Sequence, residues 1–325
     1  MMHVSKDMIH PELRKMAKVG KMMNSSPSPK NMARSAKMIK LMMKGRCWSK
    51  KLKYEQRFID RADKSQLRLC VYSPKELQKD VPGILWLHGG GYAKGVPEQD
   101  EGFIKRFVEA SGCVVVAPDY RTSLEAPYPA ALDDCYAALL WLKEQGNEYG
   151  MRDNQIMVGG DSAGGGLTAA ITLYARDKGE VAIAFQMPLY PMIDDRMNTE
   201  SATDNNAPLW DSKSNDVAWR LYLGDLFGKE DVPAYAAPAR ANDYHNLPPA
   251  VSFVGSVEPF RDEAVTYMER LREQWIPVKF KVFEGAFHAF DILSRNSTIG
   301  KEATAFLMEA FSYAVKHYFA EQPTK

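Results

Sequence analysis

The sequence predicts an α/β fold with a mostly parallel, doubly wound sheet. From Tyr54 onward, β-rich runs alternate with helical patterns, and later runs such as Gly83–His88 and Cys113–Ala117 are continuously apolar. Strands that helices cover on both faces have this composition, which is typical of parallel sheets. The strands of an eight-stranded sheet are expected at residues 54–61, 67–73, 82–88, 113–118, 155–160, 182–190, 249–256 and 277–284.

The first fifty residues differ from the rest of the chain. Residues 1–53 hold 14 Lys and Arg against two acidic residues, a net charge of +12, whereas the remainder has 28 against 39, a net charge of −11. This region also holds ten of the 17 methionines. Two helices are expected in it, over residues 11–23 and 29–44.

The second of these helices has clear boundary signals. Ser28 is expected as its N-cap and Pro29 at its first helical position, with Gly45 after its end. Helical spacing places an apolar row on one side, formed by Met32, Ser35/Ala36, Ile39 and Met42/Met43. Flexible thioethers on such a face suit a lid over a binding site.

Domain boundaries follow from these differences. Residues 1–50 are expected to form the lid and residues 51–325 the main domain. Between Asp194 and Ala241 the chain is polar and leaves the strand–helix alternation, so this excursion is expected to complete the lid. Two alternatives for the basic region stay open: helices lying on an anionic membrane, or a tail that recruits an acidic partner.

Composition excludes several classes of protein. The chain is 45% hydrophobic and 26% charged with a net charge of +1, which disfavours a nucleic-acid partner. The four cysteines fall in no C-x-x-C or other metal-ligand spacing, so free thiols in a reducing cytoplasm and no bound metal are expected. No apolar run approaches the roughly 20 residues of a membrane span, and the first residues lack the apolar core of a signal peptide.

The strongest local signal is Gly160-Asp-Ser-Ala-Gly164, a G-x-S-x-G pattern between an expected strand and an expected helix. A nucleophilic serine at a strained turn needs small residues two positions to either side, and both glycines meet that need. A phosphate-binding loop would require G-x-G-x-x-G or Gly-Lys-Ser/Thr instead. Ser162 is therefore the predicted nucleophile.

Serine needs a base to remove its proton. Of the six histidines, His288 directly follows the last expected strand, which is the position and chain order that a base requires. The others lie in the basic tail, in a glycine-rich loop, in a turn or in the last helix: His3, His10, His88, His245 and His317.

The acid that orients the histidine should follow the seventh strand. Glu258 lies on the loop just beyond that strand, and Asp262 and Glu263 lie where the first turn of the next helix favours carboxylates. Glu258 is the first choice and Asp262 the second.

A serine hydrolase also needs N–H donors for the substrate oxyanion. His88-Gly-Gly-Gly91, after the third strand, offers backbone amides without a Cβ in the way. The expected donors are Gly90, Gly91 and Ala163, the residue after the nucleophile. His88 is expected to brace the loop.

Together these motifs resemble the hormone-sensitive-lipase-like family of α/β-hydrolase esterases, in its G-D-S-A-G branch. The resemblance runs from about Leu67 to the C-terminus and includes Gly285-Ala-Phe-His-Ala-Phe290 and the Asp119–Asp133 segment. It implies an α/β-hydrolase fold, the same serine, histidine and oxyanion donors, and a cap built largely from the N-terminal helices. The family's Asp-Pro-Leu is replaced by Glu258-Pro259-Phe260, so the matching acid is one methylene longer, which keeps Asp262 open.

The expected function is a cofactor-free serine carboxylesterase acting on short- to medium-chain acyl or aryl esters. Tyr92, Trp210 and Phe287 are expected to contact the substrate. A deacetylase or amidase acting on an acetylated sugar or small amide is the alternative, because it uses the same machinery. A non-catalytic ligand-binding module on this fold and homodimerisation through the last helix or an edge strand also stay open.

Overall fold

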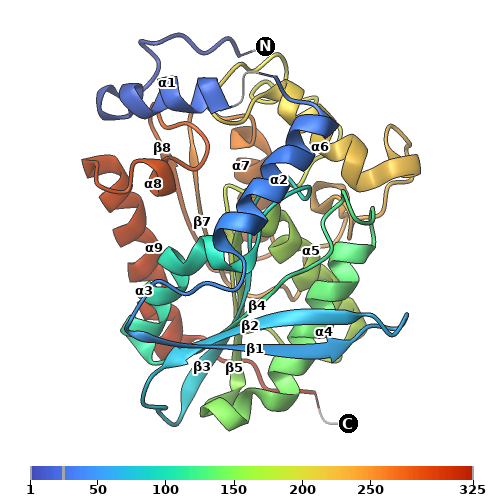
Figure 1. Ribbon diagram of the computed structural model, residues 1–325, viewed down its shortest axis with the longest axis vertical. Coiled ribbons are helices and arrows are strands. Elements are labelled where there is room, and N and C mark those ends of the chain that lie inside the picture. The colour runs from blue at the N-terminus through green and yellow to red at the C-terminus, as the bar shows by residue number, and fades with distance from the viewer. Residues whose placement is uncertain (1, 24–25, 324–325) are drawn as a thin grey trace.

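One eight-stranded sheet forms the centre of the computed structural model, which describes residues 2–23 and 26–323 (Figure 1). Its strands lie in the order β1-β2-β4-β3-β5-β6-β7-β8. Neighbours from β4 to β8 are parallel, and β2 is antiparallel to both β1 and β4. The strands are β1 (Leu52–Asp60), β2 (Gln66–Pro74), β3 (Val81–Leu87), β4 (Val114–Pro118), β5 (Met151–Asp161), β6 (Phe185–Leu189), β7 (Ala250–Gly255) and β8 (Val278–Phe283). The predicted mostly parallel sheet is confirmed, and each predicted strand overlaps an observed one.

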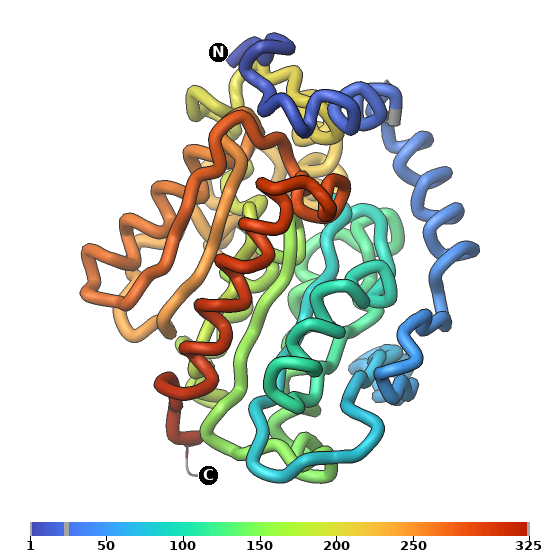
Figure 2. The backbone as a smooth tube through the Cα atoms, turned by 90° about the vertical axis from the view of Figure 1, so that its left-hand side faces the viewer, coloured from blue at the N-terminus to red at the C-terminus, as the bar shows by residue number. Residues whose placement is uncertain are grey.

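Helices cover both faces of the sheet. On one face α3 and α9 contact each other, and the other face carries α4, α5 and α7 (Figure 2). After residue 50 the α-helices are α3 (Glu101–Ser111), α4 (Ala130–Gln145), α5 (Ala163–Lys178), α6 (Ser212–Leu223), α7 (Arg261–Glu273), α8 (Phe290–Leu293) and α9 (Thr298–His317). Short 3₁₀ turns are η1 (Pro11–Leu13), η2 (Pro97–Asp100), η3 (Gly146–Tyr149), η4 (Gly224–Leu226) and η5 (Pro238–Arg240).

The neighbouring strands β3 and β4 are buried along their whole length, which explains their continuous apolar sequences. Trp86 of β3 packs against Phe103 and Phe107 of α3, with ring centroids 5.1 Å apart in both pairs. Burying side chains of this size stabilises a fold by about 1.5–3 kcal/mol each. The same packing fixes β3 and therefore the loop that follows it.

The N-terminal region forms two helices, as predicted. The first begins as η1 and continues as α1 (Arg14–Met23), and the second is α2 (Pro29–Met43). Ser28 caps α2, because its Oγ accepts a hydrogen bond from Asn31 N at 3.3 Å. Met32 and Ala36 of the predicted apolar row are buried.

The predicted apolar row is wrong at Met42. Met42 is 58% exposed, whereas Met43 beside it is partly covered. Successive helical residues differ by about 100°, so Met32, Ala36 and Met43 can share a face that Met42 has already left.

α1 lies across the end of the molecule where the parallel strands finish, and α2 runs from that end down one side (Figure 2). Figure 1 shows α1 and α2 in blue, close to α6 and the yellow excursion that follows β6. α2 and α6 are in direct contact. Within the described ranges, no helix combines the length and apolarity that a membrane crossing requires.

Candidate active site

Ser162 lies at the sharp turn between β5 and α5. Its backbone has φ 57° and ψ −119°, a strained conformation for a residue with a side chain. The turn is held by hydrogen bonds from Ser162 N to Leu189 O at 3.0 Å and from Met192 N to Ser162 O at 3.1 Å. Gly164 is required here, because a Cβ would collide with the carbonyl of Leu87.

His288 lies beside this serine. Its Nε2 is 2.8 Å from Ser162 Oγ, and its Nδ1 is 2.5 Å from Glu258 Oε2. The rings of Tyr190 and Phe260 meet the imidazole edge-on, each with a centroid distance of 5.0 Å. These rings restrict the imidazole to one orientation.

The structure brings Glu258 to the histidine and places Asp262 elsewhere. Glu258 is fully buried, and its second oxygen, Oε1, accepts a hydrogen bond from Gly255 N at 2.7 Å. Asp262 instead accepts from Ser201 N at 2.8 Å and from Arg261 Nε at 2.7 Å. The extra methylene of the glutamate is accommodated because Gly255, at the end of β7, anchors the carboxylate.

Glu263, the third carboxylate of this stretch, is also turned away from the histidine. Its Oε1 accepts a hydrogen bond from Ile193 N at 2.7 Å. Burial raises its pKa well above the usual range, and nearby Asp194 adds to the shift. Glu263 therefore supports the chain after β6.

The glycine loop after β3 lies against the serine turn. Gly91 has φ 62°, and a Cβ at this position would overlap the indole of Trp210. Ala163 is the first residue of α5, so its N–H has no acceptor four residues earlier in the helix. The structure thus places the predicted donors Gly90, Gly91 and Ala163 on the two chain segments that flank Ser162.

His88 has the bracing position that the sequence predicted. It is buried, its ring stacks on Tyr120 with a centroid distance of 4.2 Å, and its Nδ1 is 2.9 Å from Gly89 O. Tyr120 also donates to His88 O at 2.7 Å. Burial lowers the pKa of His88, which keeps the ring neutral.

The three residues predicted to contact substrate have different surroundings. Trp210 lies over Gly91, with its ring centroid 6.3 Å from that of His288. Tyr92 is buried, stacks on Tyr222 at 3.9 Å, and donates its hydroxyl to Met192 O at 2.6 Å. Phe287 is fully buried in the core. These placements favour structural roles for Tyr92 and Phe287 and leave Trp210 as the substrate-facing candidate.

The N-terminal segment joins the two loops nearest the site. Val4 N donates to Asn206 Oδ1 at 2.7 Å, in the excursion after β6. His10 N donates to Gly285 O at 2.9 Å, in the loop that carries His288. Ser162 and His288 are only 5% and 4% exposed, so the site is almost closed to solvent.

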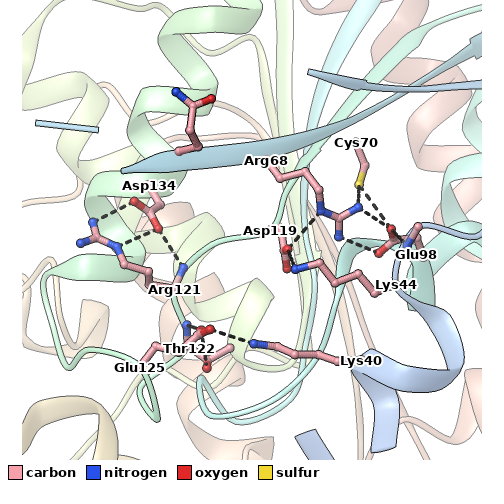
Figure 3. Close-up of polar contacts among 12 residues, drawn as sticks. Lys40, Lys44, Arg68, Cys70, Glu98, Asp119, Arg121, Thr122, Glu125 and Asp134 are labelled. Carbon is pink, nitrogen blue, oxygen red and sulfur yellow. Dashed lines mark hydrogen bonds and ion pairs between the residues drawn. The ribbon is translucent and has the colours of Figure 1, made fainter. Parts of the chain in front are cut away.

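Ion pairs attach the end of α2 to the main domain (Figure 3). Lys40 Nζ lies 2.8 Å from Glu125 Oε1, and Lys44 Nζ lies 2.7 Å from Asp119 Oδ2. Asp119 also accepts from Arg68 Nε at 3.1 Å. Lys44, the residue after α2, therefore joins a charge network that continues to Arg68 on β2. These contacts fix the helix at its C-terminal end.

The sequence interpretation missed two buried acids behind the glycine loop. Asp161 Oδ1 accepts from Gly89 N at 2.9 Å, and Asp100 Oδ2 accepts from Trp86 Nε1 at 2.9 Å. Asp161 stands inside the G-x-S-x-G motif, so its position was a usable signal. Asp100 carries no local signal, because it lies on the short turn η2. In the described part of the chain, no group of three or more His, Cys, Asp or Glu side chains is arranged to hold a metal ion.

Comparisons with known proteins identify the family of this chain. A family profile described as the α/β-hydrolase fold matches residues 84–292. Esterase LipI of Mycobacterium tuberculosis is 35% identical over 214 residues, 66% of this chain and 67% of that protein. Carboxylesterase NlhH of the same species is 33% identical over 233 residues, 70% of this chain and 72% of that protein. Among solved structures, a bacterial heroin esterase has a TM-score of 0.85 at 30% identity, covering 96% of this chain and 99% of that one.

Proposed function

Because this chain belongs to the α/β-hydrolase family and is a carboxylic ester hydrolase, we propose that it is a serine esterase whose nucleophile is Ser162. His288 is the proposed base and Glu258 the acid that orients it. The observation that carries this proposal is the unbroken chain of contacts from Ser162 Oγ to His288 Nε2, at 2.8 Å, and from His288 Nδ1 to Glu258 Oε2, at 2.5 Å.

The proposed reaction has two half-reactions. Ser162 Oγ bonds to the ester carbonyl carbon while His288 Nε2 takes its proton, and the intermediate then expels the alkoxide, which receives that proton. Water attacks the acyl-enzyme with the same histidine as base and releases the acid. Glu258 holds the imidazole in the tautomer with a proton on Nδ1 and stabilises the imidazolium that forms.

The proposed oxyanion donors are the amides of Gly90, Gly91 and Ala163. The first two are preorganised by the packing of the loop under Trp210, and the third by the start of α5. Donors fixed in a nearly dry site need no reorganisation as charge develops on the substrate oxygen. One such donor typically lowers the barrier by about 3 kcal/mol.

Residues 1–50 are the proposed cap over the catalytic domain 51–325, completed by the excursion at residues 194–241. The hydrogen bonds donated by the Val4 and His10 amides support this, since they link the N-terminal segment to the excursion and to the loop that carries His288. A nearly closed site under such a cap favours small or medium acyl and aryl esters.

Hydrolysis of p-nitrophenyl esters from acetate to decanoate tests the proposal. We expect turnover that is fastest for short chains, with an initial burst of p-nitrophenol when deacylation is the slower step. A fluorophosphonate probe should label one serine, in the peptide that contains Ser162. Labelling at another residue would contradict the assignment of Ser162 as nucleophile. Turnover of acetylated sugars or small amides alone would assign the enzyme to those substrates in place of acyl and aryl esters.

Trp210→Ala is expected to shift this preference towards longer acyl chains. The indole lies over Gly91 and near His288, so its removal opens space beside the reacting carbonyl. Space for added methylenes changes selectivity by about tenfold or more, so kcat/KM for octanoate relative to butyrate should rise by about that factor. Trp275→Ala is the matched control, because Trp275 is 94% exposed. An unchanged ratio in Trp210→Ala would remove Trp210 from the acyl site.

A further inference from the structure

Two buried carboxyl groups, Asp100 and Asp161, lie directly behind the proposed oxyanion loop. Both are almost fully covered, with 3% and 4% of each residue exposed. Their carboxyl groups lie close enough to share a hydrogen bond. Two ionised carboxylates offer only acceptors, so a hydrogen bond between them requires one of the two groups to hold a proton.

The partners of each acid indicate which one holds it. Asp161 Oδ1 accepts from the amide of Gly89 at 2.9 Å, a contact suited to an ionised carboxylate. Asp100 Oδ2 accepts from the indole of Trp86 at 2.9 Å, and the Gln99 side chain also contacts Asp100, so the proton proposed for this group lies towards Asp161, which offers only acceptors. Burial and the neighbouring Asp161 raise the pKa of Asp100 well above its usual range.

We propose that Asp100 and Asp161 share one proton and act as a clamp that positions the oxyanion loop against the serine turn. The proposal rests on Ser162 as nucleophile. Asp161 directly precedes Ser162, and its carboxylate holds the amide of Gly89, 72 positions away in the sequence, beside the proposed donors Gly90 and Gly91. Asp100, as the neutral acid, holds that carboxylate in place.

The shared proton also sets the charge behind the loop. With Asp100 neutral the pair carries one negative charge, and loss of the proton would place a second negative charge next to the site where the substrate oxyanion forms. Like charges in a buried site repel strongly, so ionisation of the pair would both separate the two side chains and oppose the oxyanion. Activity should therefore be lost on the alkaline side of the raised pKa of Asp100.

Other groups face the pair and must be separated from it. They come from β3 and the loop after it, η2, the loops after β4 and β6, the histidine loop and α8: Trp86, His88, Gln99, Tyr120, Tyr190, His288 and Asp291. Burial raises the pKa of Asp291 to about 7, so this acid also titrates within the pH range of the assay. Asp291 is the same in wild type and in a variant that changes only Asp100, so comparing these two proteins removes the contribution of Asp291.

The decisive variants are Asp100→Asn and Asp100→Leu. Asparagine can donate from its amide to Asp161 and accept from Trp86, but it cannot ionise. Leucine keeps a similar volume and does neither. We expect kcat near pH 7 to fall about 10- to 100-fold in Asp100→Leu with little change in KM, because small displacements of catalytic donors cost that much. Asp100→Asn should restore kcat to within about threefold of wild type and lack the alkaline loss.

Two readouts do not depend on turnover. At about pH 7, the infrared difference spectrum of wild type minus Asp100→Asn should show the C=O band of a protonated carboxylic acid. The folded protein then binds one proton more than the unfolded chain, in which Asp ionises near pH 4, so the free energy of unfolding falls as pH rises. From about pH 5 to the folded-state pKa, wild type should lose thermal stability more steeply than Asp100→Asn.

The possible results separate cleanly. Absence of the carboxylic acid band, or equal pH slopes of stability in wild type and Asp100→Asn, would overturn the shared proton. Unchanged kcat in Asp100→Leu, or an alkaline loss that persists in Asp100→Asn, would overturn the positioning role. Turnover that survives in Ser162→Ala would overturn the proposed nucleophile instead, and the infrared and stability measurements in that variant would still report on the pair.

Discussion

Replacing Ser162 with alanine is expected to lower kcat for p-nitrophenyl butyrate by about 10⁴- to 10⁶-fold, the range over which serine hydrolases depend on their nucleophile. The substitution removes the hydroxyl that lies 2.8 Å from His288 Nε2. KM should change little, because the pocket and the oxyanion loop stay in place. The measurement is steady-state hydrolysis at saturating ester, with the fluorophosphonate label as a second readout.

The control for this variant is Ser252→Ala. Ser252 is fully buried in β7, and its Oγ has no hydrogen-bond partner among the described residues, so it tests the removal of a buried hydroxyl away from the histidine. We expect its kcat to stay within about threefold of wild type. Residual activity in Ser162→Ala above a few per cent of wild type, in protein shown to be folded, would contradict the nucleophile assignment.

Glu258→Gln is expected to lower kcat by about 10³- to 10⁴-fold, as replacement of a triad acid by its amide does elsewhere. The physical reason lies in the tautomer of His288. Gly255 N–H needs an oxygen at the position of Oε1, so the amide nitrogen of the substituted side chain must face His288 Nδ1. Nδ1 then becomes an acceptor and Nε2 carries the proton, which leaves no base for Ser162.

Asp262→Asn is the matched control for the acid. This residue is the other carboxylate that sequence reasoning kept open, and it contacts Ser201 and Arg261 instead of the histidine. Its kcat should stay within about threefold of wild type, because the expected cost is one weakened, partly exposed hydrogen bond. A large loss in Asp262→Asn together with a small one in Glu258→Gln would assign the acid to Asp262.

Much of the fold could be predicted from the sequence because its signals are local. Continuous apolar runs predicted β3 and β4, and Ser28 with Pro29 predicted the start of α2. The exposed side of α2 was misjudged at Met42, since helical phase alone does not say where the covered face ends. Ser162 was found because a strained turn between strand and helix requires glycines at fixed positions.

The position of each site residue along the chain was therefore determined by the sequence, and the contacts between them were decided by tertiary structure. The sequence placed Glu258 before Asp262 by its position just after the strand, but only the packing of β7, β8 and the histidine loop shows which carboxylate contacts His288. The same holds for Asp100 and Asp161, which lie on different elements far apart in the chain, so no periodic signal links them. Burial is a property of the assembled core, and the protonation that we propose for this pair follows from burial. A sequence states which groups can ionise, but the low dielectric and the neighbours that shift a pKa exist only after the chain has folded.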